Sequence, residues 1–505
     1  MPSTPFTLPI QPARRAVPGS LLMLLVAVAA LVLPGQARAD RSLEAGVDEP
    51  RQFLYGDVNG SMDRIKALGA TRVRTNIIWN RVAPSASSQS KPSGFEGWKP
   101  DSEGYDWSKY DRIINAAAQR GLDVYAVVTG PGPVWASETP RRKNGAWKPS
   151  PLEFGRFAEA AADRYGDRVD RWGIYNEPNQ GGWLQPQSQR GGGGYVLRAP
   201  HHYRDLVNAS YDRIEKEDPS ATILLGNTAP TGRDDRGYTR PIRPLTFWRT
   251  FGCVSSSYKK RRSGYCRNFE RPEANDIGHH PHPVRKSPTE SSPDRNDAAI
   301  ADTTRFMRNI DWIKRANGLK RDGGGNFGVY YTEFSYQTNP PDVISGVGQV
   351  RQSLNMQEAQ YIMWRHSRVR GWMQYQLNDE PLREKETGRA RYGGWQGGIF
   401  EVDGDPKPYA RTYTAPIWRS HRRRDAGDPV RFWGQSKLVR SPQDVLLQYR
   451  NFGSSKWRDL QTIRTNGRGY FSTLRDVSRS RYYRFIYPDG KGGFETSTAR
   501  SVRIR

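Results

Sequence analysis

The stretch RWGIYNEPNQGGW, residues 171–183, points more directly than any other to the fold of this 505-residue chain. A short apolar run, Trp172 to Tyr175, stops abruptly at Asn176, Glu177, a proline and two glycines. A short apolar run bounded by turn residues is typical of a buried strand. A strand that simply meets a polar turn explains the pattern without any function. A carboxylate presented at the rim of a parallel barrel explains it as an active-site acid.

Predicted strands and helices alternate around this stretch, from residue 50 to about residue 420. Such alternation favours a parallel α/β architecture, and neither a GxGxxG motif nor a P-loop follows the first predicted strand. We therefore expect a (β/α)8 barrel, which typically takes about 250 residues and can exceed 400 with insertions. The predicted strands are 70–79, 122–135, 172–175, 221–230, 275–283, 327–338 and 370–379, and the predicted helices are 110–121, 151–167, 203–219, 303–318 and 355–369.

Three long insertions, 185–202, 231–274 and 380–396, follow predicted strands. In a barrel, the loops that follow the strands build the active site. We expect these insertions to shape a substrate cleft.

The C-terminal part of the chain has a different pattern. The basic, polar segment 419–429 is typical of a linker, and short strand-like runs separated by Gly, Ser and Asp follow it. Short strands at regular spacing indicate a small all-β sandwich of immunoglobulin or fibronectin type. We thus expect a barrel over residues 40–418, a linker over 419–429 and an immunoglobulin-like sandwich over 430–505.

The N-terminus has the features of a secretory signal. Arg14 and Arg15 precede an apolar run at 21–33, and the segment ends in Ala37-Arg38-Ala39, which predicts a signal peptide over residues 1–39. The apolar run has 13 residues, fewer than the roughly 20 that span a bilayer, although an uncleaved anchor is the alternative. We expect a secreted protein, extracellular or associated with the cell wall, without membrane contact after cleavage.

Cys253 and Cys266 are the only cysteines of the chain. In an oxidising compartment, one local pair is most simply a disulfide that closes a loop, and two free thiols are the alternative. No CxxC motif accompanies the pair, and the cluster His279, His280 and His282 is interrupted by prolines and lacks an adjacent carboxylate. We therefore expect neither a metal nor a cofactor.

The formal net charge is +26, and residues 1–39 hold three arginines and no acid, which leaves +23 on the remainder. Such a charge attracts polyanions. The basic residues are scattered and no nucleic-acid-binding motif is present. We therefore expect an anionic polysaccharide or cell-wall polymer as partner, and no nucleic acid. A genome-wide preference for Arg over Lys is the alternative explanation.

Two glutamates follow apolar runs in the same manner. Glu177 follows WGIYN and Glu333 follows FGVYYT, with aromatic residues on either side. Hydrolysis of a glycosidic bond uses two carboxyl groups, one that protonates the leaving oxygen and one that acts from the opposite face. Apolar neighbours raise a carboxyl pKa and suit it to be the acid, whereas positive charge keeps its partner ionised. A single Glu at a strand end is common, but the pair in one barrel-like chain indicates a glycosidase.

These motifs resemble those of clan A glycoside hydrolases. NEP after an apolar strand and TEF after a later one are similar to the fourth- and seventh-strand signatures of that clan, whose members have a (β/α)8 barrel and retain configuration. The resemblance implies that Glu177 is the acid/base, that Glu333 is the nucleophile and that Asn176 binds the sugar 2-hydroxyl. YNEPNQGGWL is most similar to family 39, which includes β-xylosidases and exopolysaccharide glycosidases, and family 5 is the alternative. The similarity covers roughly residues 50–420.

Further motifs extend the resemblance. VRTNIIWNRVAP is similar to a second-strand pattern whose arginine, Arg74 in this chain, supports the nucleophile. GHHPHP resembles the sixth-strand His-Pro-Tyr segment, with His280 matching the histidine and His282 standing where many relatives have tyrosine. Trp372 lies earlier than the sugar-stacking tryptophan of the family, so Trp395 or Gln376 is expected to take its place.

Several aromatic residues lie at or near predicted strand ends, where they are suited to stack on sugar faces; ordinary packing of loops is the alternative for each. The predicted substrate-binding residues are therefore Asn176, Arg74, His280, His282, Trp79, Trp135, Trp183, Tyr331 and Trp395.

The sequence thus predicts a secreted, retaining glycosidase that cleaves O-glycosidic bonds of a poly- or oligosaccharide by double displacement. A non-catalytic barrel protein that binds polysaccharide or the cell wall is the alternative, although binding alone does not require paired acids. A basic nucleic-acid-binding protein is a second alternative, and it predicts an affinity for DNA that falls steeply with salt.

Overall fold

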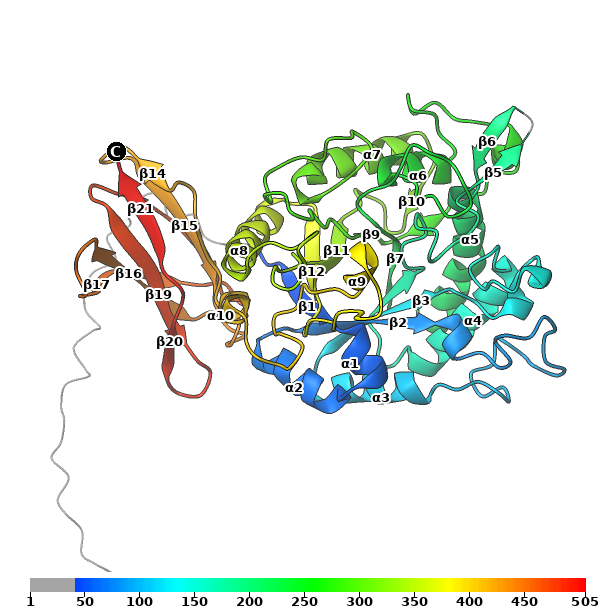
Figure 1. Cartoon of the computed structure of the whole chain (residues 1–505), viewed down its shortest axis with the longest axis horizontal. Helices are drawn as coiled ribbons and strands as arrows, with labels where there is room; N and C mark the ends of the chain where they lie inside the picture. Colours follow the sequence, from blue (N-terminus) through cyan, green and yellow to red (C-terminus); the bar gives the residue numbers. More distant parts are fainter. Residues whose placement is uncertain (1–40, 192) are drawn as a thin grey trace, which may run out of the picture. The chain divides into compact units, whose positions relative to one another are not determined.

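The computed structural model describes residues 41–191 and 193–505, so the predicted signal peptide lies outside the described residues. Eight parallel strands close into a barrel in chain order, with the last strand paired to the first (Figure 1). The expected barrel is confirmed. Its strands are β1 (Glu44–Asp48), β2 (Arg72–Ile78), β3 (Asp123–Thr129), β4 (Arg171–Ile174), β7 (Thr222–Thr228), β9 (Asp276–His279), β11 (Val329–Phe334) and β12 (Val369–Tyr375).

Each of the seven predicted strands overlaps one barrel strand, and the eighth, β1, was not predicted. This strand has only five residues, and its sequence EAGVD contains a glycine and two acids. Its last four residues are nevertheless buried, because β1 lies between β2 and β12 and closes the barrel. The hydrogen bonds that close the barrel, rather than local apolar pattern, specify this strand.

Helices follow the barrel strands along the chain. Ser150 caps α4 by accepting a hydrogen bond from the Glu153 amide, and Pro151 occupies the first turn, where its missing N–H costs nothing. Among the described residues, every helix is too short or too polar to cross a membrane. The helices are α1 (Pro50–Tyr55), α2 (Val58–Ala67), α3 (Ser108–Gln119), α4 (Pro151–Tyr165), α5 (Ala199–Glu217), α6 (Pro244–Phe251), α7 (Thr303–Arg315), α8 (Gln349–Arg365), α9 (Gly388–Arg391) and α10 (Pro408–Thr414).

Strand β3 illustrates why the barrel strands are apolar on both sides. Tyr125 and Val127 pack with Leu224 and Tyr330 in one small cluster, whereas Val124, Ala126 and Val128 belong to the large core that includes the helices. Successive side chains of a strand point to opposite faces, so one set fills the barrel and the other packs against the helices. A continuous apolar run is therefore expected for such a strand.

The insertions carry structure of their own. The insertion 185–202 contains the hairpin β5 (Ser188–Gly191) and β6 (Gly194–Leu197). In the insertion 231–274, a disulfide joins Cys253 and Cys266, as expected. Short strands β8 (Glu273–Ala274) and β10 (Lys320–Arg321) pair beside the barrel.

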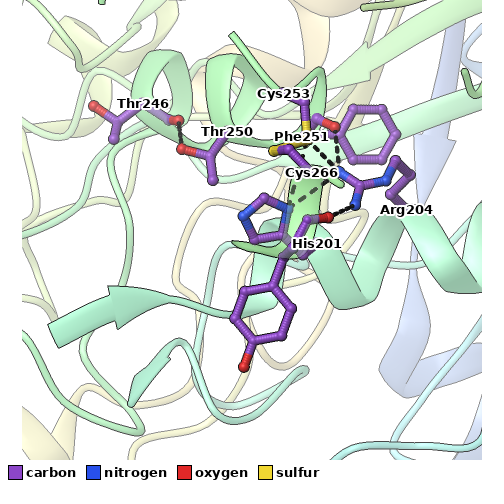
Figure 2. The surroundings of a disulfide bond; sticks show 8 residues. His201, Arg204, Thr246, Thr250, Phe251, Cys253 and Cys266 are labelled. Atoms are coloured by element: carbon purple, nitrogen blue, oxygen red, sulfur yellow. Dashed lines mark hydrogen bonds between the residues drawn. A yellow bond between two sulfur atoms is a disulfide. The ribbon is translucent and has the colours of Figure 1, made fainter. Parts of the chain in front are cut away.

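Arg204 of α5 holds the disulfide loop in place (Figure 2). Its guanidinium donates to the carbonyl oxygens of Phe251 and Tyr265, both at 2.9 Å, and to Cys253 Sγ at 3.2 Å. Because these acceptors lie on both sides of the loop, one buried side chain ties the insertion to the helix after β4.

The C-terminal residues form two further sheets. One has the order β13-β15-β18, and the other has the order β14-β21-β19-β16-β17 with β20 paired to β19 (Figure 1). Two buried apolar clusters contain side chains from strands of both sheets. The strands are β13 (Ile417–Arg419), β14 (Arg423–Arg424), β15 (Pro429–Gln435), β16 (Asp444–Asn451), β17 (Arg458–Arg464), β18 (Tyr470–Asp476), β19 (Arg481–Pro488), β20 (Phe494–Thr496) and β21 (Arg500–Ile504).

The segment expected as a linker, 419–429, belongs in part to these sheets. Strand β13, which ends at Arg419, pairs antiparallel with β15, and β14 pairs parallel with β21. The polar composition of this segment suggested a linker, but strands at the margin of a sheet carry charged residues without burying them. The all-β region therefore begins at residue 417.

Candidate active site

Glu177 and Glu333 lie next to each other at the carboxyl end of the barrel. An oxygen of Glu177, an oxygen of Glu333 and a ring nitrogen of His280 all lie within 4.8 Å of one another. His280 Nδ1 is 3.0 Å from Glu177 Oε1 and 3.5 Å from Glu333 Oε2. The side chains of Glu177 and Glu333 are 21% and 10% exposed, so solvent and solutes can reach the pair.

Glu177 reaches this position through an unusual turn after β4. Tyr175 and Glu177 have φ angles of 70° and 39°, a region that non-glycine residues rarely adopt and that is enriched at functional sites. Neighbouring strands hold the turn: the Asn176 amide donates to Thr129 Oγ1 at 3.0 Å, and the Glu177 amide donates to the Asn227 carbonyl at 3.1 Å. The abrupt end of the opening apolar run is therefore a turn held between β3 and β7.

Glu333 reaches the site through an irregularity in β11. The pairing of β11 with β12 shifts register between Tyr331 and Phe334. Tyr331 points outward to Thr303 of α7, and Thr332 Oγ1 donates to Asn227 Oδ1 inside the barrel at 2.8 Å. Strict alternation would send Glu333 outward as well. A β-bulge redirects side chains, and the bulge turns Glu333 inward.

Arg74 forms hydrogen bonds to three other residues of the site. Its fully buried guanidinium donates from Nη1 to Glu333 Oε1 at 2.7 Å and from Nη2 to Asn176 Oδ1 at 2.5 Å. The same Nη1 is hydrogen-bonded to Asp48 Oδ2, at the end of β1. A planar guanidinium with several fixed donors can orient more than one acceptor, and Arg74 sets the positions of Glu333, Asn176 and Asp48.

The pKa values of the two carboxyl groups are shifted in opposite directions. Burial raises the pKa of Glu177 to about 7, although His282, Arg74 and Trp183 oppose the shift. Burial also disfavours ionised Glu333, but contacts with His280, Arg74 and His282 outweigh it, and the pKa of Glu333 lies below its usual value. Burial lowers the pKa of His280 well below its usual value. One carboxylic acid beside one carboxylate is the arrangement that acid and nucleophile require.

These pKa values predict the pH dependence of activity. Glu177 must be protonated to act as an acid, so kcat/KM should fall as pH rises through about 7. Glu333 must be ionised, and its lowered pKa places the acidic limb below the ordinary glutamate range. With an aryl glycoside whose leaving group needs no protonation, Glu177→Gln should lose the alkaline limb. An unchanged alkaline limb in that variant would assign it to another group.

Two of the predicted aromatic residues and one histidine surround the carboxyl pair. His282 Nε2 is 3.9 Å from Glu333 Oε2, and its ring packs against Trp395 at 4.8 Å between centroids. Trp395 Nε1 donates to Ser335 Oγ at 2.7 Å, just after β11. The Trp183 side chain makes a polar contact with Glu177, and both tryptophans are partly exposed. Trp183 and Trp395 therefore present partly exposed aromatic rings close to Glu177 and Glu333.

Three predicted substrate-binding residues lie elsewhere. Trp79 is 1% exposed and stacks on Phe157 of α4, and Trp135 is 7% exposed and donates to the Pro84 carbonyl. Tyr331 is 1% exposed and bonds to Thr303 on the outside of the barrel. These predictions were wrong, because an aromatic residue at a strand end points either to the axis or to the helices. Ordinary packing, the alternative for each, applies to all three.

Two residues of the site were not predicted. Asp48 bonds Arg74, and Tyr375 at the end of β12 packs against Trp395 and His282 at 5.7 and 6.2 Å between centroids. Tyr375 is partly exposed, and it, rather than the buried Gln376, stands beside Trp395 as an aromatic surface. An aromatic residue at the end of the last predicted strand was the available signal for Tyr375. No signal marked Asp48, because β1 itself was missed.

Glu177, His280 and Glu333 offer the ligand atoms that could hold a cation among the described residues of this site. Arg74 already supplies the positive charge beside Glu333, at 2.7 Å. Within the described ranges, a second group of this kind, His201 with Cys253 and Cys266, contains the disulfide, which removes both thiolates as ligands.

No protein-family model matches this chain. Over 133 residues it is 29% identical to a β-glucosidase of Agrobacterium sp., covering 26% of this chain and 25% of the relative. Over 146 residues it is 27% identical to β-glucosidase 44 of Arabidopsis thaliana, covering 29% of this chain and 25% of the relative. The chain thus spans about a quarter of the length of these curated relatives.

A solved structure of the virulence factor SghA with its substrate analogue salicin aligns with a TM-score of 0.45 at 15% identity, covering 72% of this chain and 92% of that one. In barrel fold and in its sequence relatives, the chain is similar to glycoside hydrolases of clan A. The finer assignment to family 39 or family 5 stays a prediction.

Proposed function

We propose that this protein is a retaining glycosidase that hydrolyses O-glycosidic bonds of a poly- or oligosaccharide. The observation that carries the proposal is the pair of carboxyl groups, with oxygens within 4.8 Å and pKa values shifted in opposite directions. Retaining glycosidases hold their carboxyl groups about 5–5.5 Å apart, whereas inverting enzymes leave about 6.5–9.5 Å for a water. The β-glucosidase relatives support the same class of enzyme.

In the proposed reaction, Glu333 attacks the anomeric carbon while Glu177 protonates the leaving oxygen, which departs as an alcohol. Arg74 keeps Glu333 ionised and oriented through its 2.7 Å hydrogen bond. Glu177, now a carboxylate, takes a proton from water, and the resulting hydroxide displaces Glu333 to release the sugar. Asn176, held by Arg74 at 2.5 Å, is placed to bind a sugar hydroxyl beside the cleaved bond.

We further propose that this protein is exported. The disulfide between Cys253 and Cys266 supports export, because disulfides persist in oxidising compartments. We propose cleavage of a signal peptide after Ala39 and an extracellular location, free or on the cell wall. We also propose that the C-terminal sheets form an immunoglobulin-like sandwich, since buried clusters draw on strands of both sheets.

The stereochemistry of the product tests the proposed function. The purified protein is screened on α- and β-linked aryl glycosides of neutral and acidic sugars, and the product of the best substrate is followed by proton NMR before mutarotation. The first anomer released should have the configuration of the substrate. Release of the opposite anomer would exclude double displacement, and turnover of no glycoside in the screen would favour the non-catalytic alternative.

A further inference from the structure

Half of the net positive charge lies in the C-terminal sheets. Residues 419–505 contain 20 Lys and Arg but only 7 Asp and Glu, a net charge of +13 out of +26 for the whole chain. Three of these 20 cations, Arg424, Arg464 and Arg468, have a carboxylate within 4.0 Å among the described residues. The charge is therefore concentrated in a small region and is mostly unpaired there.

One face of the larger sheet gathers part of this charge. In β19 and β21, Tyr483, Phe485 and Val502 are buried in apolar clusters. Their neighbours in sequence point to the opposite face, because side chains alternate along a strand. Pairing of β16 with β19 places Arg450 opposite Tyr482, and Gln448 opposite Arg484. We define the arginine face by six partly or fully exposed residues: Arg450, Phe452, Trp457, Tyr482, Arg484 and Arg503.

Aromatic rings, rather than acids, hold these arginines. Arg484 lies over Trp457 at 4.1 Å from guanidinium carbon to ring centroid, and Arg450 lies over Tyr482 at 5.0 Å. Arg503 lies over Phe452 at 5.5 Å. Among the described residues, no carboxylate lies within 4.0 Å of Arg450, Arg484 or Arg503. A guanidinium stacked on a ring keeps its edge donors available for an external acceptor.

The remaining hydrogen bonds of the face leave most of these donors unused. Arg484 Nε donates to Gln448 Oε1 at 3.0 Å, and the amide of Gln448 donates to Asp459 at 2.8 Å, so Gln448 separates Arg484 from that acid. Arg450 Nη1 donates to the Ser454 carbonyl at 3.1 Å. Burial and the charges of Arg411 and Arg450 lower the pKa of Arg484, and an anion at this face would relieve that repulsion.

We propose that the arginine face binds an acidic polysaccharide whose sugars carry carboxylates. Carboxylates accept bidentate hydrogen bonds from guanidinium edges, and a chain of them matches a row of fixed arginines. A single-stranded nucleic acid fits less well, because such binding depends on bases stacking on open aromatic faces. The rings of this face are already covered: Phe452 stacks on Tyr482 at 4.5 Å between centroids, and guanidinium groups lie over the others.

The experiment measures binding of the full chain to polygalacturonate at about 0.1 M salt, where unspecific attraction is already screened beyond about 10 Å. All variants carry Glu333→Gln, so that turnover cannot remove the probe and the outcome is independent of the proposed glycosidase function. The face variant is R450Q/R484Q/R503Q. The matched control is R422Q/R475Q/R479Q, which removes the same charge from arginines of the same region outside the arginine face. Circular dichroism verifies that both fold.

The face variant should bind polygalacturonate about tenfold more weakly or worse, since several charge-assisted hydrogen bonds are lost, whereas the control should change affinity less than about twofold. Neutral dextran should not bind. Equal losses in both triple variants would overturn the proposal in favour of net charge alone. Tighter binding of oligo(dT) than of polygalacturonate, lost in the face variant, would assign the face to nucleic acid instead. Absence of polygalacturonate binding by the parent would also overturn it.

Discussion

Replacement of Glu333 by alanine is expected to lower kcat/KM for glycoside hydrolysis by about 10⁴-fold or more, because no other carboxylate can attack the anomeric carbon from that position. The bulge in β11 and the 2.7 Å hydrogen bond from Arg74 place this one side chain at the reaction centre. Glu177→Ala should cost about 10²–10⁴-fold, the usual contribution of a general acid. Steady-state kinetics on an aryl glycoside that the parent hydrolyses measure both.

Rescue of the alanine variants by azide distinguishes the nucleophile from the acid/base. In Glu333→Ala, azide attacks the substrate directly and should give an azido-sugar of inverted configuration. In Glu177→Ala, azide attacks the glycosyl-enzyme and should give an azido-sugar of retained configuration. Glu215→Ala, which changes an exposed glutamate on α5, is the control and should keep full activity. Full activity in either Glu177→Ala or Glu333→Ala would contradict the catalytic role proposed for that residue.

Replacement of Arg74 by methionine is expected to lower the free energy of unfolding by about 3–5 kcal/mol near pH 7.5, because a buried charge partner is removed. Asp48 and Glu333 would remain buried without their shared cation. Burial already raises the pKa of Asp48 to about 7 in the presence of Arg74, and loss of the arginine would raise it further. The same loss removes one of the charges that hold the pKa of Glu333 below its usual value, so that pKa would rise as well. A raised carboxyl pKa favours the folded state at low pH and costs stability as pH rises. The loss in free energy of unfolding caused by Arg74→Met should therefore be smaller at pH 5 than at pH 7.5. Urea unfolding of both proteins at the two pH values measures this difference.

The triple variant D48N/R74M/E333Q tests the electrostatic origin of this loss. Neutralising both acids should recover much of the stability that Arg74→Met removes, since the three side chains act as one network. Arg141→Met, at an exposed arginine, is the control for loss of one charge and should change the free energy of unfolding by less than about 0.5 kcal/mol. An Arg74→Met variant as stable as Arg141→Met, or one whose deficit is the same at both pH values, contradicts the account.

Several features of the fold follow from local pattern. Seven of the barrel strands and five of the ten helices in the described part of the chain overlap predicted segments, because a strand buried on two sides needs a continuous apolar run and an amphipathic helix needs a 3.6-residue period. The disulfide followed from two nearby cysteines. Glu177 and Glu333 were identified because each acid follows an apolar run. These inferences need only neighbours along the chain.

Other features depend on contacts between distant segments. The direction in which Glu333 points depends on a bulge between β11 and β12, and the turn at Glu177 depends on hydrogen bonds from β3 and β7. The same contacts decide which aromatic residues face the site. Trp183, Trp395 and Tyr375 do, whereas Trp79, Trp135 and Tyr331 pack away from it.

The amino-acid order of this protein is sufficient to specify a parallel barrel and two glutamates at strand ends, because periodicity and turn residues act locally. Pairing those glutamates within 4.8 Å, with one carboxyl pKa raised and the other lowered, requires the closed barrel. Closure brings Arg74 of β2 between Asp48 of β1 and Glu333 of β11 and removes all three from water. These side chains become buried, and the two acids come to share one cation, only when the strands assemble. No single segment of the sequence can therefore specify these properties.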